Sequence, residues 1–277
     1  MLLGRTLTEV APTPPLFTVM TWNTLSDQLS GFFPSVPDQF LSWGYRAPQI
    51  MHDLEESKAD IYCLSEIDHY DDFIVPWINK IGFEGIFKKK RGWHRDGLCI
   101  LFNRRKFTLI SQESWYFPNS NQFALVIKLA FGAIEFLIVG THLKSRSKYE
   151  EDRANQVRYL LSKLEKCAGR LPIILCGDFN SIPGSKTYNI LNSHTKLKFQ
   201  SAYMIFGSEP NFTTYKIRER VEKKTVDYIW IRGFSISRVL NIPSFESIGP
   251  TGLPSQEYPS DHLSLLCQLT IKPNESL

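Results

Sequence analysis

Short apolar runs recur along the chain and predict buried β-strands. The runs lie at residues 17–20, 61–64, 85–88, 98–102, 107–110, 123–129, 134–140, 172–176, 226–231 and 263–270. Apolar residues at helical spacing predict two helices between them, one over 73–81 that ends at Gly82 and a clearer one over 150–167. A further helix is predicted around Ile50 and Leu54, with Pro48 in its first turn.

The order of these elements indicates the fold class. Strands alternate with helices in some parts of the chain and follow one another directly in others, which favours mixed β-sheets over a purely parallel sheet. Because so many strands exceed what one layer usually holds, we predict a single α/β domain over residues 16–277 with more than one sheet. Residues 1–15, which end in Pro12, Pro14 and Pro15, are predicted to form a flexible leader.

Composition narrows the class of protein. The chain has 277 residues, of which 43% are hydrophobic and 22% are charged, so it can bury a sizeable core. Its net charge of +4 does not by itself indicate a protein that coats nucleic acid. A local basic patch over one cleft is still compatible with that charge.

The cysteines and the apolar runs bear on location. Four of the five cysteines, namely Cys63, Cys99, Cys176 and Cys267, lie in apolar runs where they act as small hydrophobes, and no C-x-x-C pair is present. We therefore expect neither a zinc site nor a disulfide framework, and we expect a reducing compartment. No apolar run approaches the roughly 18 residues that span a bilayer, and the first residues lack a signal-peptide core. A cytoplasmic location is predicted, with the nucleus or mitochondrion as alternatives.

Polar side chains suited to a hard cation or a phosphate stand where several predicted strands end or begin. They are Asn23, Glu66, His142, the pair Asp178 and Asn180, and the pair Asp261 and His262. A lone carboxylate at a strand end is usually a solvated cap. Five such positions are harder to dismiss, because open α/β sheets bind their ligands at the ends of strands.

The residue types fit hydrolysis of a phosphate ester. Mg²⁺ prefers oxygen ligands and is usually held by one or two carboxylates together with substrate phosphate. We predict Glu66 as the principal ligand, with Asn23 adjacent and Asp261 in the same metal site. Asp178 and Asn180 are two residues apart and face the same way in an extended segment. Asp178 would orient or deprotonate the attacking water, and Asn180 would hold a phosphate oxygen.

Two histidines are candidates for stabilising charge in the transition state. His142 and His262 would donate hydrogen bonds to the phosphoryl oxygens. Asp227 is a carboxylate in an otherwise apolar predicted strand and needs a partner there. His262 is the natural partner, since a carboxylate would orient its ring and keep it cationic.

These motifs, taken in order, resemble the endonuclease/exonuclease/phosphatase superfamily. The matching segments are Met20-Thr21-Trp22-Asn23, Leu64-Ser65-Glu66, Gly140-Thr141-His142-Leu143, Gly177-Asp178-Phe179-Asn180, Val226-Asp227-Tyr228-Ile229 and Ser260-Asp261-His262. Each is short, but six in order span nearly the whole chain. The resemblance implies a four-layer α/β sandwich, in which two mixed β-sheets lie face to face with helices outside. It also implies a Mg²⁺-dependent hydrolase in which Mn²⁺ could substitute.

Longer segments resemble the nocturnin branch of the carbon-catabolite-repressor-type deadenylases. They are residues 213–218, 249–254 and 258–265, whereas residues 66–70 resemble the carbon-catabolite-repressor-type deadenylases, nocturnin and angel alike. The resemblance implies either removal of the 2′-phosphate from NADP(H) or shortening of poly(A) RNA, and we take the dinucleotide reaction as primary. It places Lys90, Lys144, Arg146 and Arg218 around the substrate. The chain departs from the family pattern at Thr21 and Ser65, where Gln is usual, and in a shorter loop over 93–97.

Alternative readings accompany these expectations. A 3′-5′ poly(A) exoribonuclease needs a groove several nucleotides long and steep salt dependence. An inactive RNA-binding scaffold is a non-enzymatic alternative, disfavoured because every proposed ligand is retained.

Three aromatic residues, Phe87, Trp93 and Tyr215, are expected in the core more often than stacked on a base. No catalytic role is predicted for the remaining basic residues and histidines. Arg153 and Arg158 are expected on a solvated helix face, and His52, His69, His94 and His194 are expected to be structural or surface residues.

Overall fold

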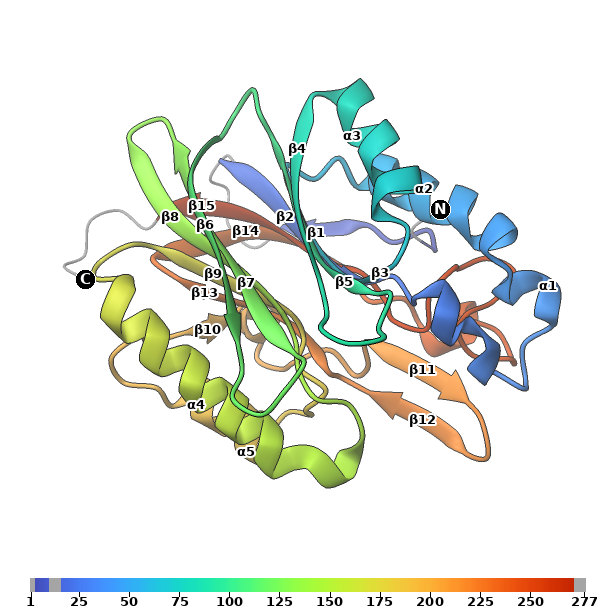
Figure 1. Cartoon of the computed structure of the whole chain (residues 1–277). Coiled ribbons are helices and arrows are strands. Elements are labelled where there is room, and N and C mark those ends of the chain that lie inside the picture. The colour runs from blue at the N-terminus through green and yellow to red at the C-terminus, as the bar shows by residue number, and fades with distance from the viewer. Residues whose placement is uncertain (1–2, 10–15, 272–277) are drawn as a thin grey trace.

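Two β-sheets pack face to face in the computed structural model, which describes residues 3–9 and 16–271. Helices cover both outer faces, so the chain forms the four layers that the sequence predicted (Figure 1). The helices α1 (Asp38–Leu41), α2 (Trp43–Ser57) and α3 (Val75–Ile81) lie outside one sheet, and α4 (Glu150–Cys167) and α5 (Lys186–Asn192) lie outside the other. None of the helices in the described residues has the length and apolar character needed to cross a membrane.

The sheets are both mixed. The first has the order β1 (Leu7–Glu9), β14 (Phe234–Leu240), β15 (Leu265–Ile271), β2 (Phe17–Asn23), β3 (Ile61–Ile67), β5 (Gly97–Asn103) and β4 (Phe83–Lys89). The second has the order β10 (Gln200–Ser201), β13 (Asp227–Arg232), β9 (Ile173–Asp178), β8 (Ile134–His142), β7 (Phe123–Phe131) and β6 (Thr108–Tyr116). A separate hairpin, β11 (Thr214–Ile217) and β12 (Val221–Lys224), projects beside them (Figure 1).

Side chains alternate between two buried environments along the central strands. In β2, Phe17 and Val19 face the other sheet, whereas Met20 and Trp22 pack under the helices. Because successive side chains of a strand point to opposite faces, a strand covered on both faces must be apolar at nearly every position. That requirement explains the continuous apolar runs in the sequence.

Parallel pairing of two strands in each sheet sets the location of the site. β2 runs parallel to β3, with Asn23 opposite Ser65, and β8 runs parallel to β9, with His142 opposite Asp178. The carboxyl ends of parallel strands meet at the same edge of their sheet. The polar residues that end these strands are therefore gathered, rather than scattered over the surface.

The structure confirms the predicted strands and the two helices, with some corrections. The helix α2 begins at Trp43, so Pro48 lies inside it and not in its first turn. Leu7–Glu9, predicted in the flexible leader, form β1 and pair with β14, whereas residues 10–15 lie outside the described residues. Arg153 was predicted on the solvated face of its helix and is instead buried, because its guanidinium binds backbone carbonyls of the neighbouring loop.

Candidate active site

The ends of four neighbouring strands bring together the residues that carry the predicted chemistry. Asn23 ends β2, His142 ends β8 and Asp178 ends β9, while Asp227 begins β13 directly opposite Asp178. The close approach of β8 and β9 requires Gly177, which has φ +135°, because a Cβ atom there would lie 1.9 Å from the carbonyl oxygen of Thr141. Backbone pairing thus fixes Asp178 beside His142.

Glu66 reaches the same place through a β-bulge. The ladder between β3 and β5 shifts between Ser65 and Ile67, and Glu66 has a left-handed φ of 60°. A bulge re-aims one side chain of a strand, and strained backbone of this kind clusters at functional sites. Its carboxylate accepts hydrogen bonds from the Asn23 side-chain amide (3.0 Å) and from the backbone N–H of Ser26 (3.2 Å).

Asp178 lies at the centre of the cluster. Its Oδ2 atom accepts a hydrogen bond from Asn23 Nδ2 at 3.2 Å and lies 3.6 Å from His142 Nε2 and 3.8 Å from His262 Nε2. Its Oδ1 atom accepts from the backbone N–H of Asn180 at 2.8 Å. Burial and the negative charge of Asp227 raise the pKa of Asp178 to about 7. A carboxylate with that pKa can exchange a proton near neutral pH.

Glu66 and Asp178 are the candidate ligands for a divalent metal ion. The two buried carboxylates share one amide donor, Asn23 Nδ2, and buried negative charge of this kind favours a cation beside it. Their oxygen atoms suit Mg²⁺. The Asn23 oxygen accepts from the N–H of Leu25 at 3.1 Å, so the Asn23 amide holds the carboxylates in place and directs its nitrogen at them.

A second grouping of possible ligands is Asp178, Asp227 and His262, whose ligand atoms lie within 4.8 Å of one another. Asp227 Oδ2 is already engaged there, since it accepts from His262 Nδ1 at 2.9 Å and from the Thr213 hydroxyl at 2.6 Å. The oxygens of Glu66 and Asp178 are therefore the better fit for a hard cation.

Asp227 and His262 form the hydrogen-bonded pair that the sequence predicted. Burial by itself lowers the pKa of His262, but the charges of Asp227 and Asp261 raise it by more than burial lowers it. The resulting pKa is about 9. The Nδ1 atom donates to Asp227, so the Nε2 atom points at Asp178 and the centre of the site. His262 is a cationic hydrogen-bond donor at neutral pH.

His142, in contrast to His262, is uncharged at neutral pH. Burial and the nearby positive charge of Lys90 hold its pKa well below the ordinary value, so the ring is neutral. Its Nε2 atom lies 4.0 Å from Glu66 Oε1, and its Nδ1 atom has no hydrogen-bond partner among the described residues. Two histidines in one site thus differ in charge because their neighbours differ.

Lys216 is a component that the sequence analysis did not single out. It extends from the β11–β12 hairpin, forms an ion pair with Asp261 Oδ2 and approaches His262 Nε2 at 3.3 Å. Thr214 and Lys216 alternate along β11, so recognising this segment as a strand would have placed both on one face. Asp261, predicted as a metal ligand, has its Oδ2 atom engaged by the Lys216 ammonium group.

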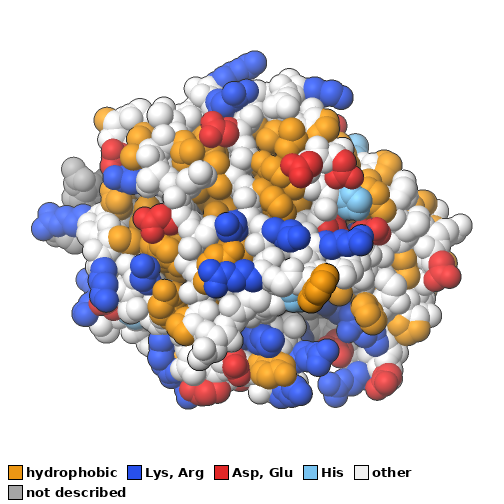
Figure 2. All heavy atoms as spheres, in the orientation of Figure 1, with side chains coloured by type: hydrophobic (Ala, Val, Ile, Leu, Met, Phe, Trp, Pro, Cys, Tyr) orange, Lys and Arg blue, Asp and Glu red, His pale blue; other side chains and the backbone are white. Residues whose placement is uncertain are grey.

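The four basic residues predicted around the substrate lie in different environments. Lys90 is buried and forms an ion pair with Asp96 at 2.5 Å. Lys144 is half-buried with its ammonium group over the Tyr149 ring, whereas Arg146 and Arg218 are exposed. Lys and Arg side chains gather near the centre and lower right of the face in Figure 2, with a histidine visible between them.

Arg153 positions the loop that follows His142. Its guanidinium donates to the carbonyl oxygens of Lys144 and Arg146 (both 2.8 Å) and to the Ser181 hydroxyl (2.8 Å), and it pairs with Glu150. The sequence held a signal for this role, because Arg153 shares helical spacing with the buried residues of α4. Asn180, with φ 51°, donates its side-chain amide to the Leu143 carbonyl and ties the same loop to β9.

The three aromatic candidates differ in exposure. Tyr215 is buried, and Phe87 is stacked on Tyr70 with ring centroids 4.6 Å apart, so both belong to the packing of the domain. Trp93 is 98% exposed and is available for contact. Of the histidines predicted as structural or surface residues, His69 stacks on Trp43 at 3.9 Å, and His52, His94 and His194 lie outside the cluster.

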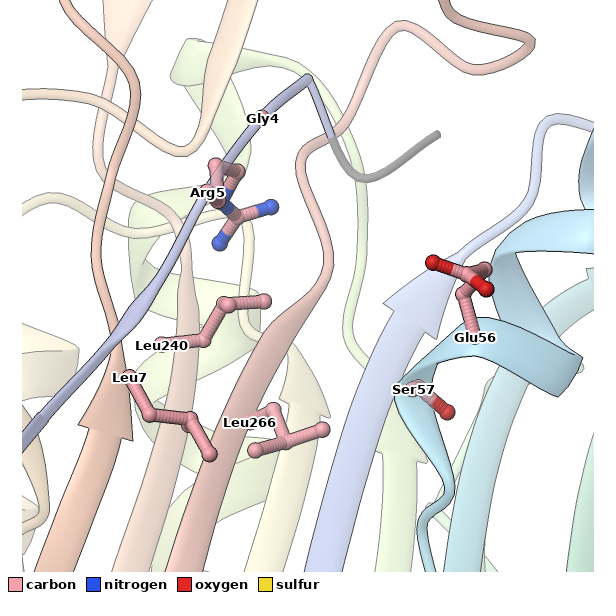
Figure 3. Close-up of a pocket in the computed structure, with 7 residues that line it drawn as sticks. All are labelled: Gly4, Arg5, Leu7, Glu56, Ser57, Leu240 and Leu266. Carbon is pink, nitrogen blue, oxygen red and sulfur yellow. The ribbon is translucent and has the colours of Figure 1, made fainter.

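A cavity of about 310 Å³ lies elsewhere, between β1, the end of α2 and β15 (Figure 3). Leucine side chains and Arg5 line much of it, and it shares no lining residue with the cluster around Asp178. Arg5 is already bound to the carbonyl oxygens of Asn241 and Ser264, both at 2.6 Å. The catalytic candidates are therefore at the strand ends and not in this cavity.

The fold and this cluster define a hydrolytic enzyme of one family. A model described as "Endonuclease/Exonuclease/phosphatase family" matches residues 20–262, and the chain belongs to that family. Enzymes of this family generally depend on a divalent metal ion, which agrees with the acidic and histidine-containing site.

Individual relatives narrow the branch to nocturnin. Rat nocturnin (Rattus norvegicus) is 34% identical over 300 residues, covering 98% of this chain and 70% of the rat protein. The human nocturnin catalytic domain with bound sulfate anion matches with a TM-score of 0.83 and 29% identity, covering 98% of both chains. The yeast CCR4-Not complex 3′-5′-exoribonuclease subunit Ccr4 is 26% identical over 91% of this chain and 38% of its own length. These relatives support a phosphoesterase or deadenylase function.

Proposed function

We propose that this protein is a Mg²⁺-dependent phosphatase that removes the 2′-phosphate of NADP(H) to give NAD(H). The observation that carries the proposal is the group of donors and cations around Asp178: Asn23, His142 and His262 face it, Lys216 lies beside His262, and the charge of Lys90 acts on His142. A phosphomonoester carries close to two negative charges near neutral pH, whereas an internal phosphodiester carries one. Since Lys90, Lys216 and His262 are each paired with a buried carboxylate, the preference for the more highly charged ligand would come from these cations together with the divalent ion that the site would hold.

The side chains divide the work of hydrolysis between them. Asp178 orients the attacking water and accepts its proton. His262, held cationic by Asp227, donates from Nε2 to a phosphoryl oxygen as negative charge shifts in the transition state. Neutral His142 donates a second hydrogen bond, and Asn180 holds the loop of Leu143 beside the phosphate.

Glu66 and Asp178 would hold the metal ion, with Asn23 fixing the distance between their carboxylates. When bound, a Mg²⁺ ion supplies Lewis-acid polarisation of the phosphoryl group. The protein supplies the geometry. The bulge at Glu66 and the hydrogen bonds from the Asn23 amide fix the orientation of both carboxylates in the protein without ligand.

Comparison with the human relative supports an anion site. The human nocturnin catalytic domain carries a bound sulfate, a tetrahedral dianion with the charge and shape of a phosphomonoester. We propose that Lys90, Lys144, Arg146 and Arg218 surround the corresponding phosphates of a dinucleotide here. The charge of Lys90 acts on His142, and the charge of Arg218 acts on Asp261.

A poly(A) exoribonuclease is the second candidate. Similarity to the yeast exoribonuclease subunit favours it, and so do the exposed Trp93, Arg146 and Arg218, which could follow a polymer beyond the reacting phosphate. Such a groove would bind several phosphates and lose affinity steeply with salt.

The deciding experiment offers both substrates to the same preparation. Purified protein with Mg²⁺ is incubated with NADPH, NADP⁺ and an A-only oligonucleotide at two salt concentrations, and an Asp178→Asn variant serves as the inactive control. We expect phosphate release from the dinucleotides with a weak dependence on salt. Steeply salt-dependent shortening of the oligonucleotide without phosphate release from NADPH would favour the exoribonuclease instead.

A further inference from the structure

Asp261 meets a cation that belongs to the protein. The side chain is 4% exposed, and its Oδ2 atom pairs with the ammonium group of Lys216. The same ammonium nitrogen lies 3.3 Å from His262 Nε2, which is 3.7 Å from Asp261 Oδ2. Lys216 thus sits inside the cluster, beside the groups that would face a phosphate.

The backbone holds Lys216 in that position. β11 joins the segment that carries Asp261 and His262 through a bridge between Thr214 and His262. The Thr214 hydroxyl donates to the Asp261 carbonyl (2.7 Å), and the N–H of Leu263 donates to the Thr213 carbonyl (2.7 Å). Only 20% of the Lys216 side chain is exposed, so it is no freely moving surface lysine.

This arrangement leaves oxygen ligands for one divalent ion. Asp227 is engaged by His262 and Thr213, and one oxygen of Asp261 is engaged by Lys216. The other Asp261 oxygen, Oδ1, is buried without a hydrogen-bond partner among the described residues. A divalent ion on Oδ1 would share one carboxylate with an ammonium group that already lies 3.3 Å from the cationic His262, and this further double charge would repel both.

Building on the metal dependence proposed above, we infer that Lys216 takes the place of a second divalent ion. The site then holds a single ion at Glu66 and Asp178, and Asp261 serves as the partner of Lys216 and not as a metal ligand. The Lys216 ammonium group supplies positive charge next to His262, where the phosphoryl oxygens would lie. The second cation of the reaction is therefore the ammonium group of Lys216 on the β11–β12 hairpin.

Counting bound Mn²⁺ on the substrate-free protein tests the inference without an activity assay. Free Mn²⁺ is measured by electron paramagnetic resonance during a titration. We expect one ion per wild-type chain, and a second ion in Lys216→Met, which exposes Asp261. The double variant Lys216→Met/Asp261→Asn should return to one ion. Lys223→Met is the matched control. Lys223 is on the same hairpin as Lys216, but its ammonium group lies over the Phe245 ring, so its loss should leave the count at one ion.

Asp261→Asn alone adds a test that does not need the Lys216 variant to fold. Its Mn²⁺ dissociation constant should stay within about threefold of wild type, since a lost ligand would cost far more. Two ions in the wild-type protein, one ion in folded Lys216→Met, or a large loss of affinity in Asp261→Asn would each overturn the inference while leaving the proposed function intact. Absence of any bound ion in the wild type would overturn the metal-dependent function and this inference together.

Discussion

Replacing Asp227 with Asn tests the electrostatic logic of the site. The change keeps the size of the side chain and can keep the hydrogen bond from Thr213, but it removes the negative charge that faces His262 Nδ1 at 2.9 Å. His262 then loses the largest of the influences that raise its pKa. We expect the ring to remain in place and to spend less of its time protonated at neutral pH.

The size of the effect follows from the pKa. Burial alone would lower the pKa of His262 below its ordinary value of 6.5, and Asp227 and Asp261 together raise it to about 9. One pKa unit corresponds to about 1.4 kcal/mol. Since Asp261 remains, we assign about 2 kcal/mol to Asp227, within the range for hydrogen bonds to charged groups. That loss predicts a fall in kcat of about 30-fold with little change in KM.

The pH dependence has a definite sign. The pKa of His262 is raised in the folded state, so its contribution to stability is full below about 6.5 and is lost as the pH rises through about 9. Asp227→Asn should therefore reduce the free energy of unfolding more at pH 6 than at pH 9.5. Because the charge of Asp227 also raises the pKa of Asp178, both the acidic and the alkaline limbs of the kcat profile should move to lower pH.

Steady-state kinetics of phosphate release from NADPH between pH 5.5 and 10 provide the measurement. Asp60→Asn is the control, because Asp60 accepts from the N–H of Thr18 and pairs with Lys106 at the opposite end of β3. Its kcat profile should match that of the wild type. A folded Asp227→Asn variant with wild-type kcat and an unmoved alkaline limb would refute the role given to the Asp227–His262 pair.

Three further predictions concern the metal, the loop and the substrate. Glu66→Gln should abolish Mg²⁺-dependent turnover without lowering the melting temperature, and a variant that keeps wild-type activity would remove Glu66 from the metal site. Arg153→Met should cost about 3–5 kcal/mol in urea unfolding because it strips a buried charge network, whereas Arg158→Met on the exposed face should cost little; equal effects would contradict the burial argument. Arg218→Ala should lower kcat/KM for NADPH by about 1–3 kcal/mol, with Arg220→Ala as the exposed control, and an unchanged value would exclude contact with substrate.

Much of the fold was predictable because burial on both faces leaves a strong signal. The central strands had to be apolar at nearly every position, and the structure places them where the sequence predicted. Short elements were not predicted, because they leave a weak signal in the sequence. β14 is interrupted by Ser237 and Arg238 around a bulge, and α5 has only seven residues, so neither presents a long periodic pattern.

The candidate site shows a similar division. His142 and Asp178 could be brought together from sequence because parallel strands end at a common edge of their sheet. The meeting of that edge with Asn23 in the other sheet, and the bulge that directs Glu66, depend on tertiary packing. The ion pair between Lys216 and Asp261 could not be predicted, since it depends on a hairpin that packs against a segment about 45 residues further along the chain. Side-chain partnership across such a distance is set by tertiary packing and leaves no local pattern.

Identifying the bond that breaks in NADPH tests the central claim most directly. The protein is incubated with NADPH and Mg²⁺ in water enriched in ¹⁸O, and the products are separated and weighed by mass spectrometry. Attack of water on the 2′-phosphorus predicts NADH together with inorganic phosphate that carries one ¹⁸O atom. Cleavage at the pyrophosphate, which would release the nicotinamide mononucleotide, or recovery of unchanged NADPH from an enzyme that shortens oligo(A), would contradict the account.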